Sequence, residues 1–323
     1  MIRPVRYRDL AAIGSIHRVS HAIRDEWQTG AAPRAWPSTH GTLLSSMLPA
    51  RTVHTYVSEE GGQIYGFLQI RPRPSRDKWD IIRLVATVDR PADVWTKLLE
   101  FACVAVGNRG AGKLFANVQD DADELQIFRR IGFYRFTAER SLSLALPGSA
   151  PFPPLPSNLR PAESRDSFAL LQLYASIAPR NVQQAEGVTA RDWALPTSRL
   201  AGLLNRVGLA QDSPQTVWNF VAEEGGHLFG WFRLRRLDGR ARLTFLLRPD
   251  KRDRMPDLCS FLIGAARAIQ PGGLSVSVRD YQQELIPVFT DAGFEDDGCY
   301  LLLVKHIAVQ VMERRLAPVL TRA

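Results

Sequence analysis

The chain contains the same sequence pattern twice. Residues 57–71 read VSEEGGQIYGFLQIR and residues 221–235 read VAEEGGHLFGWFRLR, a separation of 221 − 57 = 164 residues with seven of the fifteen positions identical. Composition alone would give about one match over this length. Such a repeat predicts two copies of one structural unit, each with its own apolar core.

The correspondence extends to both ends of the repeat. Each copy begins with Arg-Pro followed by Arg-Asp, at residues 3–9 and 160–166, and each closes its last helix with Phe-x-x-x-Gly-Phe, at residues 128–133 and 289–294. A proline-rich segment, which favours a semi-rigid extended linker, lies between the copies. The sequence therefore predicts an N-terminal unit at 1–146, a linker at 147–157, a C-terminal unit at 158–306 and a helical tail at 307–323.

Length and composition agree with two globular units. The 323 residues are 45% hydrophobic and 23% charged, and the formal net charge is +8. This charge favours acidic partners: nucleotides, phosphorylated cofactors, nucleic acid or anionic lipid. Cys103, Cys259 and Cys299 are odd in number and have no metal-ligand spacing. Cys103 and Cys259 lie inside apolar helical runs, so we expect both to be small core residues and the compartment to be reducing. No signal-like or membrane-length apolar segment is present, which predicts a cytoplasmic protein without a membrane partner.

Each unit has the same predicted order of elements. A short strand leads into an amphipathic helix and a less regular stretch, and two strands then meet at Glu-Glu-Gly-Gly, where the paired glycines favour a tight hairpin. A third strand, an apolar helix from Asp93 or Asp257, a buried strand and a helix ending at Gly132 or Gly293 follow. Apolar strands at 141–146 and 300–305 close the units. The fold class is α/β, with a mixed central sheet flanked by helices in each unit.

This order, with the Arg-Pro…Arg-Asp opening and the closing Gly-Phe, resembles the GNAT superfamily of acyl-CoA N-acyltransferases. The resemblance covers nearly the whole chain twice, and the layout is similar to double-GNAT proteins of the mycothiol synthase type. It implies acetyl-CoA as a cosubstrate, with its pyrophosphate on a Gln/Arg-x-x-Gly-x-Gly/Ala loop at the start of the central helix. It also implies that the pantetheine arm pairs with a splayed strand, that a general base assists the attacking amine and that a tyrosine protonates the thiolate.

The loop before the central helix departs from that pattern in both units. Arg90 matches the arginine of the motif, but Asp93 and Asp257 stand where its first glycine belongs, and we interpret both as helix N-caps. A carboxylate 4 Å from a phosphate would oppose it by about 4 kcal/mol. In the second unit three basic residues precede the helix and offset this repulsion, although they also fit a solvated basic turn. The expected cofactor-binding residues are Leu247, Lys251, Arg252, Arg254, Asp257 and Leu258, with Arg90 as the counterpart in the first unit.

The catalytic groups are less well defined. Phe128 and Phe289 occupy the tyrosine position and are predicted to pack in the core, because a phenyl ring cannot donate a proton. Tyr281 and Tyr300 are the candidate acids, with a structural role as the alternative. Asp80, which has no matching carboxylate in unit two, is a candidate base. Further candidates, each with a packing or solvent-facing alternative, are Glu223, Glu224, His17, His21 and His40 as bases and Trp27, Trp36 and Trp193 as acceptor-pocket residues.

Two functions follow from these patterns. The first is an acyl-CoA-dependent N-acyltransferase, with acetyl-CoA as the expected donor and a small-molecule or peptide amine as acceptor, active in the C-terminal unit. The second is a non-catalytic tandem GNAT-fold protein that binds or regulates and has lost the cofactor site. Nucleic-acid binding is disfavoured, because the arginines are spread over both halves without an aromatic-interleaved basic stripe. The identity of the acceptor and the oligomeric state stay open.

Overall fold

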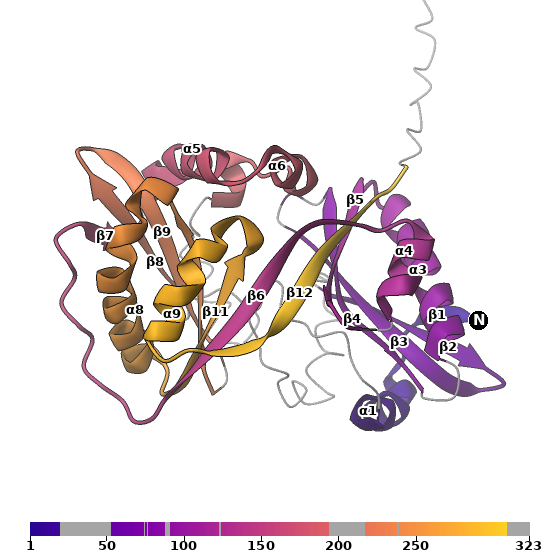
Figure 1. The fold of residues 1–323 in the computed structure, drawn as a ribbon. Helices are drawn as coiled ribbons and strands as arrows, with labels where there is room; N and C mark the ends of the chain where they lie inside the picture. Colours follow the sequence, from indigo (N-terminus) through magenta and orange to yellow (C-terminus); the bar gives the residue numbers. More distant parts are fainter. Residues whose placement is uncertain are drawn as a thin grey trace, which may run out of the picture.

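Two lobes share one continuous sheet (Figure 1). The computed structural model describes residues 1–19, 53–73, 75, 77–87, 91–122, 124–193, 217–237 and 239–308. Unit one comprises β1 (Ile2–Pro4), η1 (Tyr7–Asp9), α1 (Leu10–Val19), β2 (His54–Glu60), β3 (Gln63–Pro72), β4 (Lys78–Ala86), α3 (Pro91–Gly107), β5 (Lys113–Gln119), α4 (Glu124–Ile131) and β6 (Tyr134–Leu146). Unit two comprises β7 (Leu159–Pro161), η2 (Ser164–Asp166), α5 (Ser167–Ile177), α6 (Arg180–Glu186), η3 (Ala190–Trp193), β8 (Val217–Glu224), β9 (His227–Arg236), β10 (Ala241–Leu247), η4 (Pro249–Arg254), α8 (Met255–Ile269), β11 (Gly272–Arg279), η5 (Asp280–Leu285), α9 (Ile286–Asp291) and β12 (Glu295–His306).

The repeated glycines act as the sequence predicts. Gly61 and Gly62, at φ 57° and 82°, form the turn between β2 and β3, and the β8–β9 turn has the same conformation. Gly132, at φ 93°, ends α4, and the amide of Phe133 returns to the Phe128 carbonyl at 3.0 Å. The two phenyl rings pack edge to face at 5.0 Å. The second unit repeats this helix end.

The Arg-Pro…Arg-Asp motif builds an ion pair in each unit. Arg3 makes two hydrogen bonds to the Asp9 carboxylate, at 2.7 and 2.9 Å, and its Nε also pairs with Glu59. Arg160 repeats the arrangement with Asp166, at 2.8 and 2.9 Å, and with Glu223 at 2.9 Å. The motif therefore joins the first strand of each unit to its first helix and to the strand before the glycine turn.

The two units exchange their closing strands. The sheet order is β1-β2-β3-β4-β5-β12-β6-β11-β10-β9-β8-β7, so β12 from unit two lies against β5 of unit one, and β6 from unit one lies against β11. Figure 1 shows β6 and β12 crossing together between the lobes. Both strands are longer than expected and begin directly after the Gly-Phe turn. Each unit thus supplies the strand that completes the other unit's sheet.

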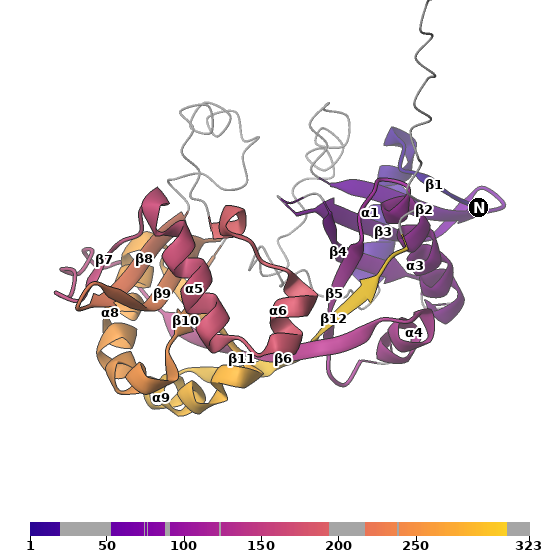
Figure 2. The ribbon, with the colours of Figure 1, turned by 90° about the horizontal axis from the view of Figure 1, so that it is seen from above.

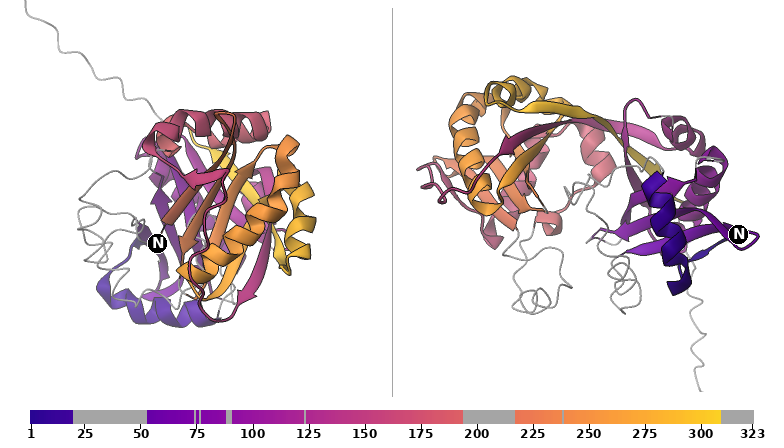
Figure 3. Two further views of the ribbon diagram at one scale, coloured as in Figure 1. Left: turned by 90° about the vertical axis from the view of Figure 1, so that its left-hand side faces the viewer. Right: turned by 90° about the horizontal axis from the view of Figure 1, so that it is seen from below.

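Helices cover both faces of this sheet. Helices α3 and α4 lie on one face of the sheet in unit one, and α8 and α9 lie on one face in unit two (Figure 3). Their apolar side chains form the cores beneath them. On the opposite face, α1 covers unit one and α5 and α6 cover unit two. The core below α5 and α6 also contains Phe115 and Phe136 of unit one, so the two units share part of their interior.

Helix α6 lies at the junction of the units, beside β6 (Figure 2). Asn181 donates to the Phe136 carbonyl at 2.9 Å. Lys113 donates to the carbonyls of Gln184 and Ala185, and Lys78 donates to that of Gly187. Lysines of unit one therefore satisfy the carbonyls at the carboxyl end of a unit-two helix, where cations are favoured.

Candidate functional site

In each unit two neighbouring strands separate along part of their length: β4 and β5 in unit one, and β10 and β11 in unit two. β4 and β5 pair in parallel only from Lys78 to Asp80, and β10 and β11 pair only from Ala241 to Leu243. The remaining residues of β4 and β10 continue along β3 and β9, and among the described residues no strand pairs with their other edge. A strand edge inside a covered sheet presents backbone N–H and C=O groups to whatever fills the gap. Each unit therefore contains an opening between two strands at the sheet centre.

The two openings differ in shape. β4 has a register shift against β3 between Gln69 and Ile70, which leaves Ile82 as an extra residue in β4, whereas β10 pairs with β9 without interruption. A bulge bends its strand and increases the local twist. In unit one this bend lies directly after the point where β4 leaves β5.

A buried side chain occupies the opening of unit two. Gln282 of η5 is 1% exposed, and its amide donates to the Leu247 carbonyl at 3.0 Å. The matching residue in unit one is Ala86, because Ala86 pairs with Gly66 as Leu247 pairs with Gly230. Among the described residues no side chain donates to the Ala86 carbonyl. The described residues thus leave the Ala86 carbonyl without a side-chain donor at the position where the Leu247 carbonyl has one.

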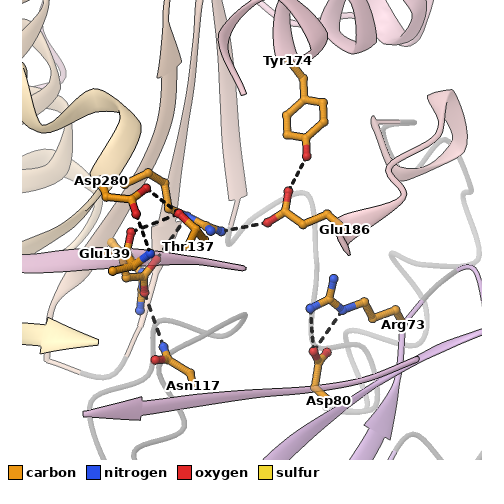
Figure 4. Close-up of polar contacts among 11 residues, drawn as sticks. Arg73, Asp80, Asn117, Thr137, Glu139, Tyr174, Glu186 and Asp280 are labelled. Atoms are coloured by element: carbon orange, nitrogen blue, oxygen red, sulfur yellow. Dashed lines mark hydrogen bonds and ion pairs between the residues drawn. The ribbon is translucent and has the colours of Figure 1, made fainter. Parts of the chain in front are cut away.

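Asp80 stands where β4 and β5 part, opposite Phe115. Its Oδ1 accepts two hydrogen bonds from Arg73, at 3.0 and 2.8 Å, while its Oδ2 is buried and has no hydrogen-bond partner among the described residues (Figure 4). Burial raises the pKa of Asp80, and the charges of Arg73 and Arg71 oppose that rise. A desolvated carboxylate with one oxygen left unbonded is a chemically competent proton acceptor.

Neither aspartate at the start of the central helices is an N-cap, so that interpretation is wrong. Asp93 is the third residue of α3, is exposed and pairs with Lys97 at 2.8 Å. Asp257 is the third residue of α8, whose N-cap is Arg254 and has no side-chain cap bond. Among the described residues no hydrogen bond joins either carboxylate to a first-turn amide of its helix.

The start of α3 holds two polar groups without partners. Trp95, 9% exposed, has an indole N–H with no acceptor, and the hydroxyl of Thr87 at the end of β4 is buried and unbonded among the described residues. Arg90 lies outside the described residues. A buried donor without an acceptor costs free energy unless a ligand or water satisfies it. Thr87 follows the end of β4 and Trp95 is the fifth residue of α3, so both groups lie where the chain passes from β4 to α3.

Two of the three basic residues before α8 pair with a carboxylate of unit two, whereas Arg252 is exposed. Lys251 pairs with Glu224, and Arg254 lies 3.3 Å from the same carboxylate. The lysine lowers the pKa of Glu224. Residues 249–254 form the 3-10 helix η4 in place of an open loop, and the Met255 amide donates to the Arg252 carbonyl. Because η4 carries Pro249 and α8 carries Pro256, two of the backbone positions here have no N–H to offer a phosphate.

The other predicted residues that the structure describes lie in different parts of it and do not form one site. Phe128 and Phe289 are fully buried, as expected for core residues. Tyr281 lies in η5 and burial raises its pKa, whereas Tyr300 lies on the exchanged strand between Gln119 and Glu139. The side chains that lie outside the described residues are His17, His21, His40, Trp27 and Trp36.

Five more predicted residues have packing, pairing or backbone roles. Glu223 pairs with Arg160, and Trp193 packs edge to face on Trp231 with centroids 5.0 Å apart. Cys259 is buried in the α8 core, where desolvation raises the pKa of its thiol to about 11. The thiol is therefore protonated at neutral pH and inert. Leu247 and Leu258 are both 1% exposed, so only the backbone of Leu247 faces the opening.

A buried polar network that the sequence did not indicate links the units below α6 (Figure 4). Arg279 lies 3.4 Å from Glu139 and 3.3 Å from Glu186, and Tyr174 donates to Glu186 at 2.6 Å. The desolvated position beside Glu186 raises the pKa of Tyr174. Glu139 belongs to β6, so the exchanged strand carries a charge that the other unit neutralises. Glu139, Glu186 and Arg279 lie outside the repeated motifs, so no local pattern indicated them.

No protein-family model and no curated protein sequence matches the chain. Solved structures match almost its whole length. A GCN5-related N-acetyltransferase from Sphaerobacter thermophilus is 15% identical over 96% of both chains, with a TM-score of 0.59. A tandem GNAT protein from the clavulanic acid biosynthesis pathway is 14% identical over 95% of this chain and 98% of its own, with a TM-score of 0.55. A putative acetyltransferase from Pyrococcus horikoshii is 12% identical over 96% and 90%, with a TM-score of 0.53.

These similarities confirm the predicted fold: the chain has the tandem GNAT fold, an α/β fold with two GNAT-like units. No helix among the described residues has the length and apolar character needed to cross a membrane.

Proposed function

We propose that the protein is an acyl-CoA-dependent N-acyltransferase whose acyl-CoA site is the opening between β4 and β5 of unit one. The observation that carries the proposal is the free inner edge of β4 after Asp80, in a fold shared with N-acetyltransferases. An extended arm with amide groups, such as pantetheine, satisfies such an edge as an added strand would. The donor is an acyl-CoA, with acetyl-CoA as the first to test, and the acceptor is an amine.

The residues of unit one support a direct transfer. The amine attacks the thioester carbonyl, and its C–N bond forms as the C–S bond breaks. Asp80, directly or through a water molecule, takes the proton that the amine loses, because its Oδ2 is unbonded and its pKa is raised. Phe128 supplies no acid, so the thiolate takes its proton from water or from the protonated acceptor. Thr87 and Trp95 provide donors for the polar part of the cosubstrate.

This choice of unit reverses the expectation from the sequence, which favoured unit two for its basic residues. In unit two Glu224 binds Lys251 and Arg254, and Gln282 holds the Leu247 carbonyl. Unit two is therefore proposed as the non-catalytic unit. The alternative, a protein without acyl-CoA chemistry in either unit, is supported by Trp95 and Asp93 at the positions of the two motif glycines.

Calorimetric titration with acetyl-CoA separates these possibilities. We expect one site per chain, an affinity about tenfold weaker in Thr87→Val because a hydrogen bond to a charged group is worth about 1.5–3 kcal/mol, and unchanged binding in Lys251→Gln. Weaker binding in Lys251→Gln together with unchanged binding in Thr87→Val would instead indicate a site in unit two. Absence of heat at millimolar acetyl-CoA would leave the non-catalytic alternative.

A further inference from the structure

Helix α6 of unit two contacts the strands that carry Asp80. Lys78 and Lys113 are Cα partners in the parallel pairing of β4 and β5, and both donate to carbonyls at the carboxyl end of α6. The next pair on the same face of the sheet is Asp80 and Phe115, because side chains two residues apart on a strand point to one side. The end of α6 therefore lies within two residues, along both strands, of the carboxylate proposed as the base.

Arg73 holds one oxygen of that carboxylate. It lies on the same face as Asp80, because Arg71 is the cross-strand partner of Asp80 and Arg73 follows two residues later. The Arg73 amide donates to the Lys78 carbonyl at 2.8 Å, which fixes its backbone against β4. Two guanidinium nitrogens of Arg73 donate to Oδ1 of Asp80, at 3.0 and 2.8 Å (Figure 4). Since both bonds go to Oδ1, the guanidinium determines that Oδ2 is the oxygen left without a hydrogen bond.

Phe115 supports the guanidinium of Arg73. The Cζ atom of Arg73 lies 3.8 Å from the centre of the Phe115 ring, and stacking on an aromatic face favours one plane for a guanidinium. The Phe115 ring is fully buried and packs edge to face on Phe136, with centroids 5.9 Å apart. Both rings belong to the core that Val182 and Ala185 of α6 complete. The placement of Arg73 therefore depends on side chains of unit two.

The charged groups near Asp80 come from several elements. Burial raises the pKa of Asp80, and the charges of Arg73 and Arg71 and the hydrogen bonds of Arg73 oppose that rise. The two lysines of β4 and β5 direct their ammonium groups to the carbonyls of α6. The carboxylate of α6, Glu186, pairs within unit two. Arg73 thus acts on Asp80 through both its charge and its hydrogen bonds.

We propose that Arg73 is a positioning residue for Asp80, and that α6 of unit two keeps it in place through Phe136 and Phe115. This inference rests on the proposed function, in which Asp80 accepts the proton of the amine. Arg73 binds Oδ1, so Oδ2 is left for that proton. Unit two thereby contributes to a reaction in unit one without binding acyl-CoA itself.

Steady-state kinetics of two Arg73 variants across pH test the positioning role. Arg73→Gln should lower kcat by up to about 10²-fold, as expected for a misplaced reacting group, with KM for acetyl-CoA unchanged. The rise of its rate should move to higher pH, because a cation that favours ionised Asp80 is lost. Arg73→Lys keeps the charge but loses the fork, so the profile should stay near that of the wild type while kcat is lower. A wild-type kcat and profile in Arg73→Gln would overturn the proposal.

A pair of valine variants tests the contribution of unit two. Val182 packs in the core under α6 and Val276 in the core under α8, and both are almost fully buried. We expect Val182→Ala to lower kcat severalfold and Val276→Ala, the matched control, to leave it unchanged. Combining Val182→Ala with Arg73→Gln should cause no further loss, because two changes that act through one contact are not additive. Equal effects of the two valine variants, or additive effects in the combination, would contradict a role for α6.

Carboxyl ¹³C NMR of aspartate-labelled full-length protein separates this inference from the proposed function, with Asp80→Asn to assign the signal. We expect a higher pKa of Asp80 in Arg73→Gln than in the wild type, and a shifted Asp80 signal in Val182→Ala but not in Val276→Ala. The titration needs no turnover. These changes in a protein that transfers no acyl group would refute the proposed function and leave the coupling of Arg73 to α6 standing. An unchanged Asp80 pKa in Arg73→Gln would refute the coupling.

Discussion

The two units carry different chemistry on one scaffold. At the point where the third and fourth long strands part, unit one has Asp80, with a raised pKa, and unit two has Arg242. In unit one the Ala86 carbonyl, six residues after Asp80, has no side-chain donor among the described residues. In unit two Gln282 donates to the equivalent Leu247 carbonyl. Hairpins, helix ends and buried ion pairs are preserved in both. Duplication therefore kept the residues that stabilise the fold and let the residues at the openings diverge.

The largest expected effect comes from the carboxylate that distinguishes unit one. Asp80→Asn keeps the shape and the contact to Arg73 but removes the proton acceptor, so acyl transfer should fall by about 10²–10⁴-fold. Acetyl-CoA binding should change little. The wild-type rate should rise with pH as Asp80 ionises, at a pH above the ordinary aspartate range, because its pKa is raised.

Steady-state kinetics across pH test this prediction. Asp296→Asn, which removes an exposed carboxylate paired with Arg140, is the matched control and should leave the profile unchanged. A variant Asp80→Asn with full activity would show that the base lies elsewhere.

The repeated ion pairs should differ in strength. Arg3 and Asp9 are 8% and 3% exposed, whereas Arg160 and Asp166 are 31% and 6% exposed. Removing one partner of a buried pair costs about 3–5 kcal/mol, so Arg3→Gln should lower the unfolding free energy by about this amount and Arg160→Gln by less. Urea unfolding of both variants measures the difference, and equal losses would contradict the role of burial.

The same pairs predict the acid stability of the fold. Their arginines lower the pKa values of Asp9 and Asp166 below the ordinary value of about 3.9. The stabilisation is therefore complete above that value and is lost as the pH falls through the lowered pKa values. Urea unfolding between neutral pH and pH 3 should show a smaller pH-dependent loss in the two arginine variants than in the wild type.

The smallest effect is expected from cutting the connection between the units. Since β6 pairs with β11 and β12 with β5, a chain cleaved at a protease site inserted between Ser149 and Ala150 should still run as one species in size-exclusion chromatography. Reverse-phase separation in denaturant confirms the cut. Dissociation of the halves under native conditions would show that the exchanged strands do not hold the units together.

Local sequence signals identified most of the scaffold. The glycine pairs, the Gly-Phe helix ends and the order of strands and helices depend on neighbouring residues, and the structure has them where the repeat placed them. Asp93 and Asp257 show the limit of such signals. Each precedes an apolar run as a cap would, yet each helix begins two residues earlier, at Pro91 and Met255. Proline and the preceding 3-10 turn, rather than the aspartate, set the start in unit two.

By itself the amino-acid sequence determined that this protein is a duplicated α/β unit with an excess of positive charge. Repeats, hydrophobic periodicity and composition depend only on the order and type of the residues. Only the tertiary structure decided that the closing strands are exchanged, that Gln282 fills one opening and that Arg235 faces Arg242. Those facts depend on contacts between residues far apart in sequence. The local sequence pattern of a strand does not specify which strand lies beside it, so only the packed sheet determines which edges pair.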